Sequence, residues 1–178
     1  EIDTKYYNSV SGNGAYPLMN RPSMQKTAPG STFKMVTATA ALEESGILSS
    51  PNEKILDEHE FKLVNPSPKC WSKSSHGKID VTDALRFSCN YFFYEIGYRL
   101  GLTSNGSLNH EKGLATLSKY AKMFGLGDTS GIELSEAIPK ISDYDTVRSA
   151  IGQGNHSYTP AGLSRYVTTL ANSGTCYN

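Results

Sequence analysis

Apolar residues recur three and four positions apart along much of the chain, which is the spacing typical of amphipathic helices. The stretches that show it most clearly are 31–45, 90–100, 111–124 and 159–172. Gly46 follows the first, in a position that tolerates a positive φ, while Thr159 and Pro160 open the last as N-cap and first helical residue. A short helix over 83–88, with Thr82 as its N-cap, fits the same reading. We therefore predict four or five helices.

Strand signals are weaker than helix signals in this chain. Residues 53–64 alternate loosely between apolar and polar and predict one or two short strands, and residues 147–151 predict a strand or a turn. Residues 1–26 and 65–79 are rich in Asn, Gly, Ser and Pro, which predicts loops. The expected fold is mainly α: a helical domain, or the helical half of a mixed one.

Composition narrows the class of protein. The 178 residues include 17 basic and 17 acidic side chains, so the formal net charge is zero. The length is sufficient for one domain with a sizeable core, and no basic block points to nucleic acid. No apolar run approaches the roughly 18 residues of a transmembrane helix. The opening EIDTKYYNSV and the closing ANSGTCYN read as cuts inside a domain, so we expect a piece of a longer protein.

The stretch TAPGSTFK, residues 27–34, carries the first candidate chemistry. Ser31 and Lys34 are one helical turn apart and share a face, and Ser31 falls in the first turn, at the positive end of the helix dipole. The dipole and any burial disfavour a protonated Lys34, and a neutral amine can take a proton from a serine hydroxyl. Alternatively, Ser31 is a helix cap and Lys34 a solvated surface charge.

The stretch RFSCNYFF, residues 86–93, carries the second candidate. Ser88 and Asn90 lie in a short link between two predicted helices, where both side chains can face one cleft. A serine can relay a proton, and an asparagine amide offers one donor group and one acceptor to a substrate amide. Alternatively, the stretch is a helix break with Asn90 as N-cap.

Together the two stretches resemble penicillin-binding transpeptidases, in which S-x-x-K is followed by S-x-N. Residues 20–46 are similar to the nucleophile helix of that family. Residues 70–101, CWSKSSHGKIDVTDALRFSCNYFFYEIGYRLG, resemble the second-motif segment of class B, penicillin-binding protein 2-type enzymes. FGLGDTSGIELSEA and AIGQGNHSYTPAGLSRYVTTLANSG resemble two further landmarks, in the family's order. The resemblance makes 1–178 a partial transpeptidase domain.

The resemblance implies a serine D,D-transpeptidase that cross-links peptidoglycan. Ser31 would be the acylated nucleophile, Lys34 its base, Ser88 a proton shuttle and Asn90 a substrate-binding residue. Ser31 would attack the penultimate D-Ala of one stem peptide, and an amine of a second stem peptide would resolve the acyl-enzyme. β-Lactams would acylate the same serine, which would link the protein to antibiotic resistance as well as to cell wall and cell shape.

The family's third motif, K-[ST]-G, does not occur in this sequence. Lys78, Lys112 and Lys140 stand in KID, KGL and KIS. In the family this motif lies on a strand of the central sheet and supplies an oxyanion donor, so the expected fold is the helical subdomain of the α/β serine transpeptidase and β-lactamase-like fold, with the sheet largely missing. Losing one such donor costs on the order of 3 kcal/mol of transition-state stabilisation. We expect the isolated fragment to be inactive.

Two alternatives to a transpeptidase stay open at this point. A β-lactamase or β-lactam sensor shares the fold, although the sequence offers no convincing Glu for activating the deacylating water. A non-catalytic scaffold fragment would keep the helices and lose the chemistry, and the missing third motif favours it.

Three side chains before and within the second motif suggest a metal site. Cys70, His76 and Cys89 supply two thiolates and an imidazole, which suit tetrahedral zinc. Asp57, with His59 behind it, is the candidate fourth ligand. The spacing matches no common zinc-finger pattern, and a Cys70–Cys89 disulfide or two free, partly buried thiols are open alternatives. No cofactor is required for the expected chemistry, so zinc would be structural and would position Ser88 and Asn90. Cys176 is taken as incidental.

The resemblance also implies partners and a location. We expect peptidoglycan stem peptides and β-lactams as ligands, a glycosyltransferase as protein partner of the full-length enzyme, and no nucleic acid. The site of action would be the extracytoplasmic face of the bacterial cell membrane, with the anchor outside this chain.

Trp71 and the aromatic run 91–94 are expected in the core and cleft wall. GQG, residues 152–154, with His156 would line the cleft.

Overall fold

The computed structural model describes residues 3–177. In chain order, its elements are α1 (Thr4–Ser11), α2 (Arg21–Met24), the 3-10 helix η1 (Gly30–Phe33), α3 (Lys34–Glu43), β1 (Ile55–Asp57), β2 (Gly77–Ile79), α4 (Val81–Arg86), α5 (Asn90–Gly101), α6 (His110–Met123), α7 (Thr146–Ser149) and α8 (Pro160–Ala171). β1 and β2 pair antiparallel, with Ile55 opposite Ile79, and form the one sheet of these residues. The prediction of a mainly helical fold is confirmed.

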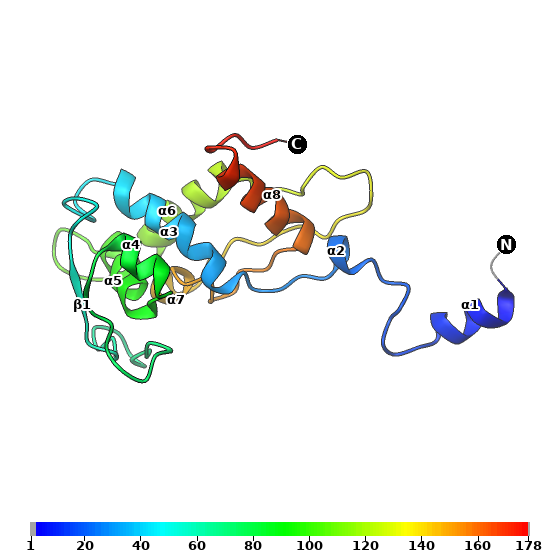
Figure 1. The fold of residues 1–178 in the computed structure, drawn as a ribbon, viewed down its shortest axis with the longest axis horizontal. Helices are drawn as coiled ribbons and strands as arrows, with labels where there is room; N and C mark the ends of the chain where they lie inside the picture. Colours follow the sequence, from blue (N-terminus) through cyan, green and yellow to red (C-terminus); the bar gives the residue numbers. More distant parts are fainter. Residues whose placement is uncertain (1–2, 178) are drawn as a thin grey trace.

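The helical body forms around α5. This helix packs against α3, α6 and α7, as Figure 1 shows, and it also contacts β1 and α4. α8 packs against α2, which precedes it by far in the sequence, on another side of the body. α1 lies apart from the body at the end of an extended segment, and none of its side chains is buried. The body therefore brings α3, which follows Ser31, against α5, which follows Ser88.

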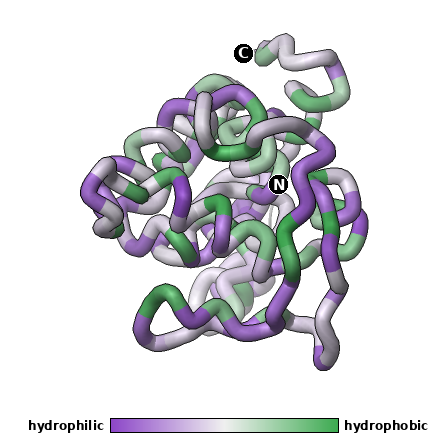
Figure 2. The backbone as a smooth tube through the Cα atoms, turned by 90° about the vertical axis from the view of Figure 1, so that its left-hand side faces the viewer, coloured by the Kyte–Doolittle hydropathy of each residue, from purple (hydrophilic) through white to green (hydrophobic). Residues whose placement is uncertain are grey.

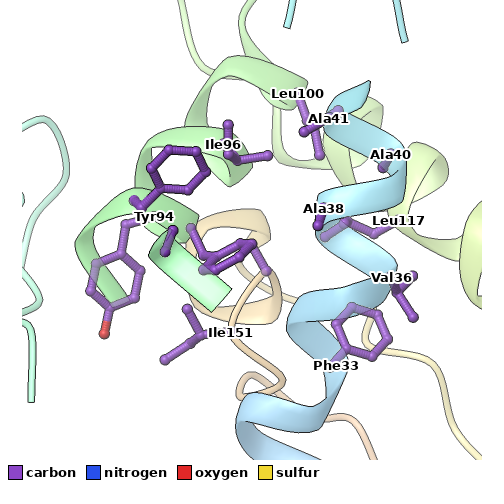
Figure 3. Close-up of a cluster of buried hydrophobic side chains, with 14 of the residues drawn as sticks. Phe33, Val36, Ala38, Ala40, Ala41, Tyr94, Ile96, Leu100, Leu117 and Ile151 are labelled. Atoms are coloured by element: carbon purple, nitrogen blue, oxygen red, sulfur yellow. The ribbon is translucent and has the colours of Figure 1, made fainter. Parts of the chain in front are cut away.

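The core lies where α3 meets α5 and α6. Figure 3 shows small side chains of α3, among them Ala38 and Ala41, facing Ile96 and Leu100 of α5 and Leu117 of α6. Alanine has the highest helix propensity and lets backbones approach closely, so an alanine-rich α3 can lie deep in the body. The amphipathic pattern of 111–124 is confirmed, since Leu114, Leu117, Tyr120 and Ala121 are buried on α6.

The helix ends follow local capping chemistry. Thr159 caps α8 as predicted, because its side chain accepts a hydrogen bond from the Gly162 N–H. The predicted start of the 83–88 helix is wrong by two residues: α4 begins at Val81, and Asp80, not Thr82, accepts from the Asp83 N–H. Gly46 has φ +82°, the positive value that its place after a helix predicted.

Three predictions about local structure are wrong. Residues 1–26 were predicted to be loop, but Thr4–Ser11 and Arg21–Met24 are helical, and the Asp3 carboxylate caps the first of these by accepting from the Lys5 N–H. Of the segment 147–151, which was predicted to be strand or turn, residues 150–151 are turn, but Thr146–Ser149 forms one helical turn that Asp145 caps. Gly77–Ile79, in a segment predicted to be irregular, pairs as β2.

Hydrophobic stretches along the backbone are short. Figure 2 shows hydrophobic and hydrophilic residues interleaved along the chain. Among residues 3–177, we find no helix whose length and apolar character would suit a bilayer crossing.

Candidate active site

The turn that carries Ser31 is held by a second loop far along the chain. Gly30 has φ +57°, and its N–H donates to the Gly152 carbonyl oxygen at 3.1 Å. A Cβ at Gly152 would lie 2.0 Å from the Gly30 oxygen, so only glycine fits there. The placement of the GQG segment along the cleft stays a prediction, and Gly152 packs against the backbone of the turn that carries Ser31. Sequence reasoning missed this role because it depends on a contact between distant residues.

Side chains from three other segments fix the same turn. Phe33 is fully buried, and its ring lies 4.2 Å from that of His156, centroid to centroid. The Tyr166 hydroxyl of α8 donates to the Thr32 carbonyl oxygen at 2.8 Å, and the Thr37 hydroxyl donates to the Ala150 oxygen at 2.8 Å. Ser31 therefore stands on a turn that contacts from distant segments hold in place, which suits a candidate nucleophile.

Lys34 is buried, with 1% of its surface exposed, which excludes the alternative of a solvated surface charge. Its Nζ donates three hydrogen bonds: to the Ser88 carbonyl oxygen at 2.8 Å, to Ser88 Oγ at 3.0 Å and to Asn90 Oδ1 at 2.7 Å. An ammonium has three donors, so all of them are used. The three motif residues Lys34, Ser88 and Asn90 thus meet at one nitrogen.

Ser88 connects the lysine to Ser31. The Ser88 hydroxyl lies 3.0 Å from Ser31 Oγ as well as 3.0 Å from Lys34 Nζ. Ser88 has φ +51°, an uncommon value for a residue with a side chain. The three side chains form a continuous path, from Ser31 through Ser88 to Lys34, along which a proton can pass.

The capping alternatives do not describe these residues. The N-cap position of η1 is Pro29, and Ser31 makes no side-chain cap bond there. The N-cap position of α5 is Cys89, while Asn90 is the first helical residue and turns its oxygen to Lys34. This contact also shows what spacing could not: the asparagine oxygen is aimed at the lysine.

Burial changes the acid–base behaviour of Lys34. Desolvation disfavours the ammonium and lowers the pKa of Lys34 to about 8, against the opposing effect of negative charge on Cys89 and Cys70. About a tenth of the amine is then neutral at pH 7, far more than for a lysine with an ordinary pKa. A neutral amine keeps two N–H groups, which match the Ser88 carbonyl oxygen and Asn90 Oδ1, two acceptors that cannot donate. Its lone pair is left for the hydroxyls.

The four candidate metal ligands gather around Cys89, the residue between Ser88 and Asn90. The ligand atoms of Asp57, Cys70, His76 and Cys89 all lie within 4.8 Å of one another. The Cys70 and Cys89 Sγ atoms are 4.0 Å apart, and both cysteines are free thiols, so this structure contains no Cys70–Cys89 disulfide. His76 Nδ1 lies 2.7 Å from Asp57 Oδ2 and 3.9 Å from Cys70 Sγ.

The surroundings of this cluster favour the deprotonated forms of Asp57 and Cys70 and the protonated form of Cys89. Burial opposes the charge of Asp57, but the backbone N–H groups of His76 and His59 donate to its carboxylate and hold its pKa below the ordinary value. A hydrogen bond from Cys89 lowers the pKa of Cys70, while the same bond and burial raise that of Cys89. His59, the second choice for the fourth ligand, is not among the clustered ligand atoms, and its backbone N–H donates to Asp57 Oδ1 at 2.7 Å.

Of the two places expected for Trp71, the core and the cleft wall, the core is wrong, and the cleft wall stays a prediction. Its side chain is 65% exposed, although its neighbour Cys70 is buried. Phe92, Phe93 and Tyr94 are buried as predicted. His156 is buried at the back of the nucleophile turn, where desolvation lowers its pKa to about 4 and keeps it neutral.

Comparison with known proteins identifies relatives over almost the whole chain. The model of the penicillin binding protein transpeptidase domain matches residues 3–178. The peptidoglycan D,D-transpeptidase MrdA of Haemophilus influenzae is 30% identical, over 97% of this chain and 27% of its own length. The chain thus spans about a quarter of this curated relative.

Solved structures show the same fold. A structure described as the structural coordination of polymerization and crosslinking by a peptidoglycan synthase complex matches with a TM-score of 0.83 and 26% identity, over 97% of this chain and 30% of that one. Penicillin-binding protein 2 in its complex with MreC from Helicobacter pylori matches with a TM-score of 0.82 and 24% identity, over 97% of this chain and 33% of that one.

Proposed function

Because the chain belongs to the family of penicillin-binding protein transpeptidase domains, we propose that it carries the nucleophile, base and proton relay of a serine D,D-transpeptidase that cross-links peptidoglycan stem peptides. The observation that carries the proposal is the continuous contact from Ser31 through Ser88 to a buried Lys34. The similarity to MrdA supports the choice of reaction.

The first half of the reaction forms an acyl-enzyme on Ser31. Neutral Lys34 takes the Ser31 proton through the Ser88 hydroxyl, and Ser31 Oγ bonds to the carbonyl carbon of the penultimate D-Ala. The bond from that carbon to the nitrogen of the terminal D-Ala breaks. The departing amine receives the proton back from the Lys34 ammonium by the same path, so the lysine ends neutral.

The second half transfers the acyl group to an amine of another stem peptide. This amine loses a proton to Lys34 as its nitrogen bonds to the acyl carbon, and Ser31 Oγ leaves and recovers its proton. Both serine hydroxyls rotate freely, so the same 3.0 Å contacts serve in either direction. A β-lactam would open on Ser31 by the first half alone and stay as an adduct.

A direct test of this function is product analysis with the full-length protein. Pentapeptide-bearing peptidoglycan strands should release one D-Ala for each cross-linked dimer, and Ser31→Ala should release none. Ser164→Ala, on α8, is a matched serine control and should behave like the parent. Fast hydrolysis of a penicillin would show a β-lactamase instead, and a Ser31→Ala protein that still cross-links would reject the proposal.

We further propose that Asp57, Cys70, His76 and Cys89 hold a structural zinc ion. Two sulfur ligands, one imidazole and one carboxylate suit tetrahedral zinc, and ligand atoms about 3.3–3.8 Å apart are expected around such an ion. The Cys89 Sγ to Asp57 Oδ2 distance of 3.6 Å lies in this range, and the two sulfur contacts of Cys70, 3.9 and 4.0 Å, are slightly longer. His76 Nδ1 and Asp57 Oδ2, now 2.7 Å apart in a hydrogen bond, would separate as both bind the ion. Zinc would supply a rigid cross-link between the 70–76 loop, β1 and the start of α5.

Such a cross-link would also help to hold the residues of the proton relay in position. Cys89 lies between Ser88 and Asn90, which both contact Lys34. A fixed Cys89 would hold the backbone on which these two side chains stand. The ion would therefore support the geometry of the relay without touching the substrate.

We place the reaction at the extracytoplasmic face of the bacterial cell membrane, with peptidoglycan stem peptides as substrates and β-lactams as inhibitors. We also propose a glycosyltransferase partner for the whole protein. Support comes from a similar solved structure, whose description joins polymerization and crosslinking in one peptidoglycan synthase complex. Co-purification of the full-length protein with a glycan polymerase tests the partnership.

A further inference from the structure

Trp71 is exposed to solvent but hydrogen-bonded to the candidate active site. Its side chain is 65% exposed, and it is the one tryptophan of the chain. The indole Nε1 donates to the Ser88 carbonyl oxygen at 3.0 Å. A ring that leaves most of its surface in water gains little from burial, so its place is better explained by this hydrogen bond.

The residue that accepts this bond is held in a strained conformation. Ser88 has φ +51°, which residues with a Cβ keep only where the surroundings hold them. Its N–H donates to the Leu85 oxygen at 3.1 Å, and its carbonyl oxygen accepts from both Lys34 and Trp71. The two donors occupy both lone pairs of the oxygen and so fix the peptide plane that follows Ser88.

The two donors differ in what happens to them during the reaction. Lys34 gains and loses a proton in each half-reaction, so its hydrogen bond to Ser88 changes in strength as its charge changes. The indole N–H keeps its proton throughout. Trp71 is thus the donor whose hold on the Ser88 carbonyl is constant while Lys34 cycles.

We propose that Trp71 is a positioning residue of the Ser31 relay: its indole N–H holds the Ser88 carbonyl oxygen and keeps the Ser88 hydroxyl between Ser31 and Lys34. This inference rests on the proposed function. The backbone of Trp71 is held in place because the preceding residue, Cys70, is buried. The His76 ring lies 6.0 Å away and tilted by 53°, which limits movement of the indole on that side.

Two other roles for Trp71 make different demands. If the ring served only to pack against His76, its shape would matter and its N–H would not. If the ring served to contact substrate, its loss would weaken binding before any bond forms. A positioning role through Ser88 instead slows the chemical step, with binding unchanged.

The experiment separates the N–H from the ring. In the full-length protein, benzothienylalanine is placed at position 71 by site-specific suppression, which replaces the N–H by sulfur and keeps the bicyclic shape. Tryptophan inserted by the same suppression is the matched control, Trp71→Phe is the genetic counterpart, and Tyr144→Phe, at another exposed aromatic, reports general effects. Acylation by a fluorescent penicillin is followed to separate the dissociation constant of the initial complex from the rate constant of acylation.

We expect benzothienylalanine and phenylalanine to lower the acylation rate constant about five- to tenfold, the effect of one hydrogen bond, with the dissociation constant unchanged. An unchanged rate constant for benzothienylalanine would overturn the proposal, as would an effect confined to the dissociation constant. Failure of the tryptophan control to react at all would instead contradict the proposed function, so the two failures are distinguishable.

Discussion

The side-chain oxygen of Asn90 lies 2.7 Å from Nζ of Lys34, although 56 residues separate them in the sequence. The bond makes Asn90 a partner of the proposed base, in addition to the substrate-binding role that the sequence predicted. Because an amide oxygen accepts and cannot donate, it orients the amine without taking its proton. The substrate-binding role of Asn90 stays a prediction.

The pH dependence of acylation should follow the protonation of Lys34. Burial lowers the Lys34 pKa to about 8, so the neutral base is scarce below that pH and predominates above it. We expect the rate of acylation by a penicillin to rise with pH through about 8 and then to level off. Stopped-flow measurement between pH 6 and pH 9.5 tests this.

The control for that profile is Lys34→Arg. A guanidinium stays protonated over the whole range, so the rise with pH should vanish and the rate should fall about 10²–10⁴-fold, as expected for loss of a general base. A parent profile that is flat from pH 6 to 9.5 would contradict the assignment of Lys34 as base.

Asn90→Asp should move the profile in a known direction. A carboxylate in place of the amide would lie within hydrogen-bonding distance of the ammonium and stabilise it, which raises the pKa of Lys34. The midpoint of the rate profile should shift upward by at least about 1 pH unit, and the rate at pH 7.5 should fall. Asn90→Ser, which adds no charge, is the control; a downward shift in Asn90→Asp would argue against the contact.

Gly152→Ala should destabilise the fold much more than Gly46→Ala. Both glycines have positive φ, but an added Cβ at Gly152 would lie 2.0 Å from the Gly30 oxygen, whereas at Gly46 it would meet nothing within 4 Å. We expect a loss of more than about 3 kcal/mol in the free energy of unfolding for Gly152→Ala and about 1–2 kcal/mol for Gly46→Ala. Urea unfolding of the two variants gives the comparison, and equal losses would show that the close contact with Gly30 is absent.

Zinc content should depend on Cys89 and not on Cys176. Elemental analysis of metal-replete protein should give one zinc per chain, and Cys89→Ser should lose it together with several degrees of thermal stability. Cys176→Ser should retain both, because Cys176 is not among the four clustered ligands. A parent protein without stoichiometric zinc would end the zinc proposal and leave two buried free thiols.

Much of this arrangement was predictable because it is local. The spacing of Ser31 and Lys34 follows from one helical turn, and Thr159 with Pro160 follows from capping rules. The choice of Asp57 with the two cysteines and His76 as metal ligands followed from ligand chemistry, and the structure brings all four together. The helical identity of 90–100 and 111–124 came from strong periodicity.

What was missed depends on contacts between distant residues. In the sequence, nothing distinguishes Gly152 from the other glycines among the 16 of the chain. Its importance follows from its contact with Gly30, which only the fold reveals. Trp71 reads as a core residue by type, but its neighbour Cys70 is turned inward and the indole is left outside. The helical turn at Thr146–Ser149 is too short for periodicity to reveal, and Asp145 fixes it through a cap.

The most direct test of the central claim is the intact mass of the full-length protein with and without benzylpenicillin, followed by peptide mapping. We predict an increase equal to the mass of the intact penicillin, stable over hours, located on Ser31 and absent from Ser31→Ala. An adduct on another residue, or an unchanged mass in a protein shown to be folded, would contradict the assignment of Ser31 as the nucleophile.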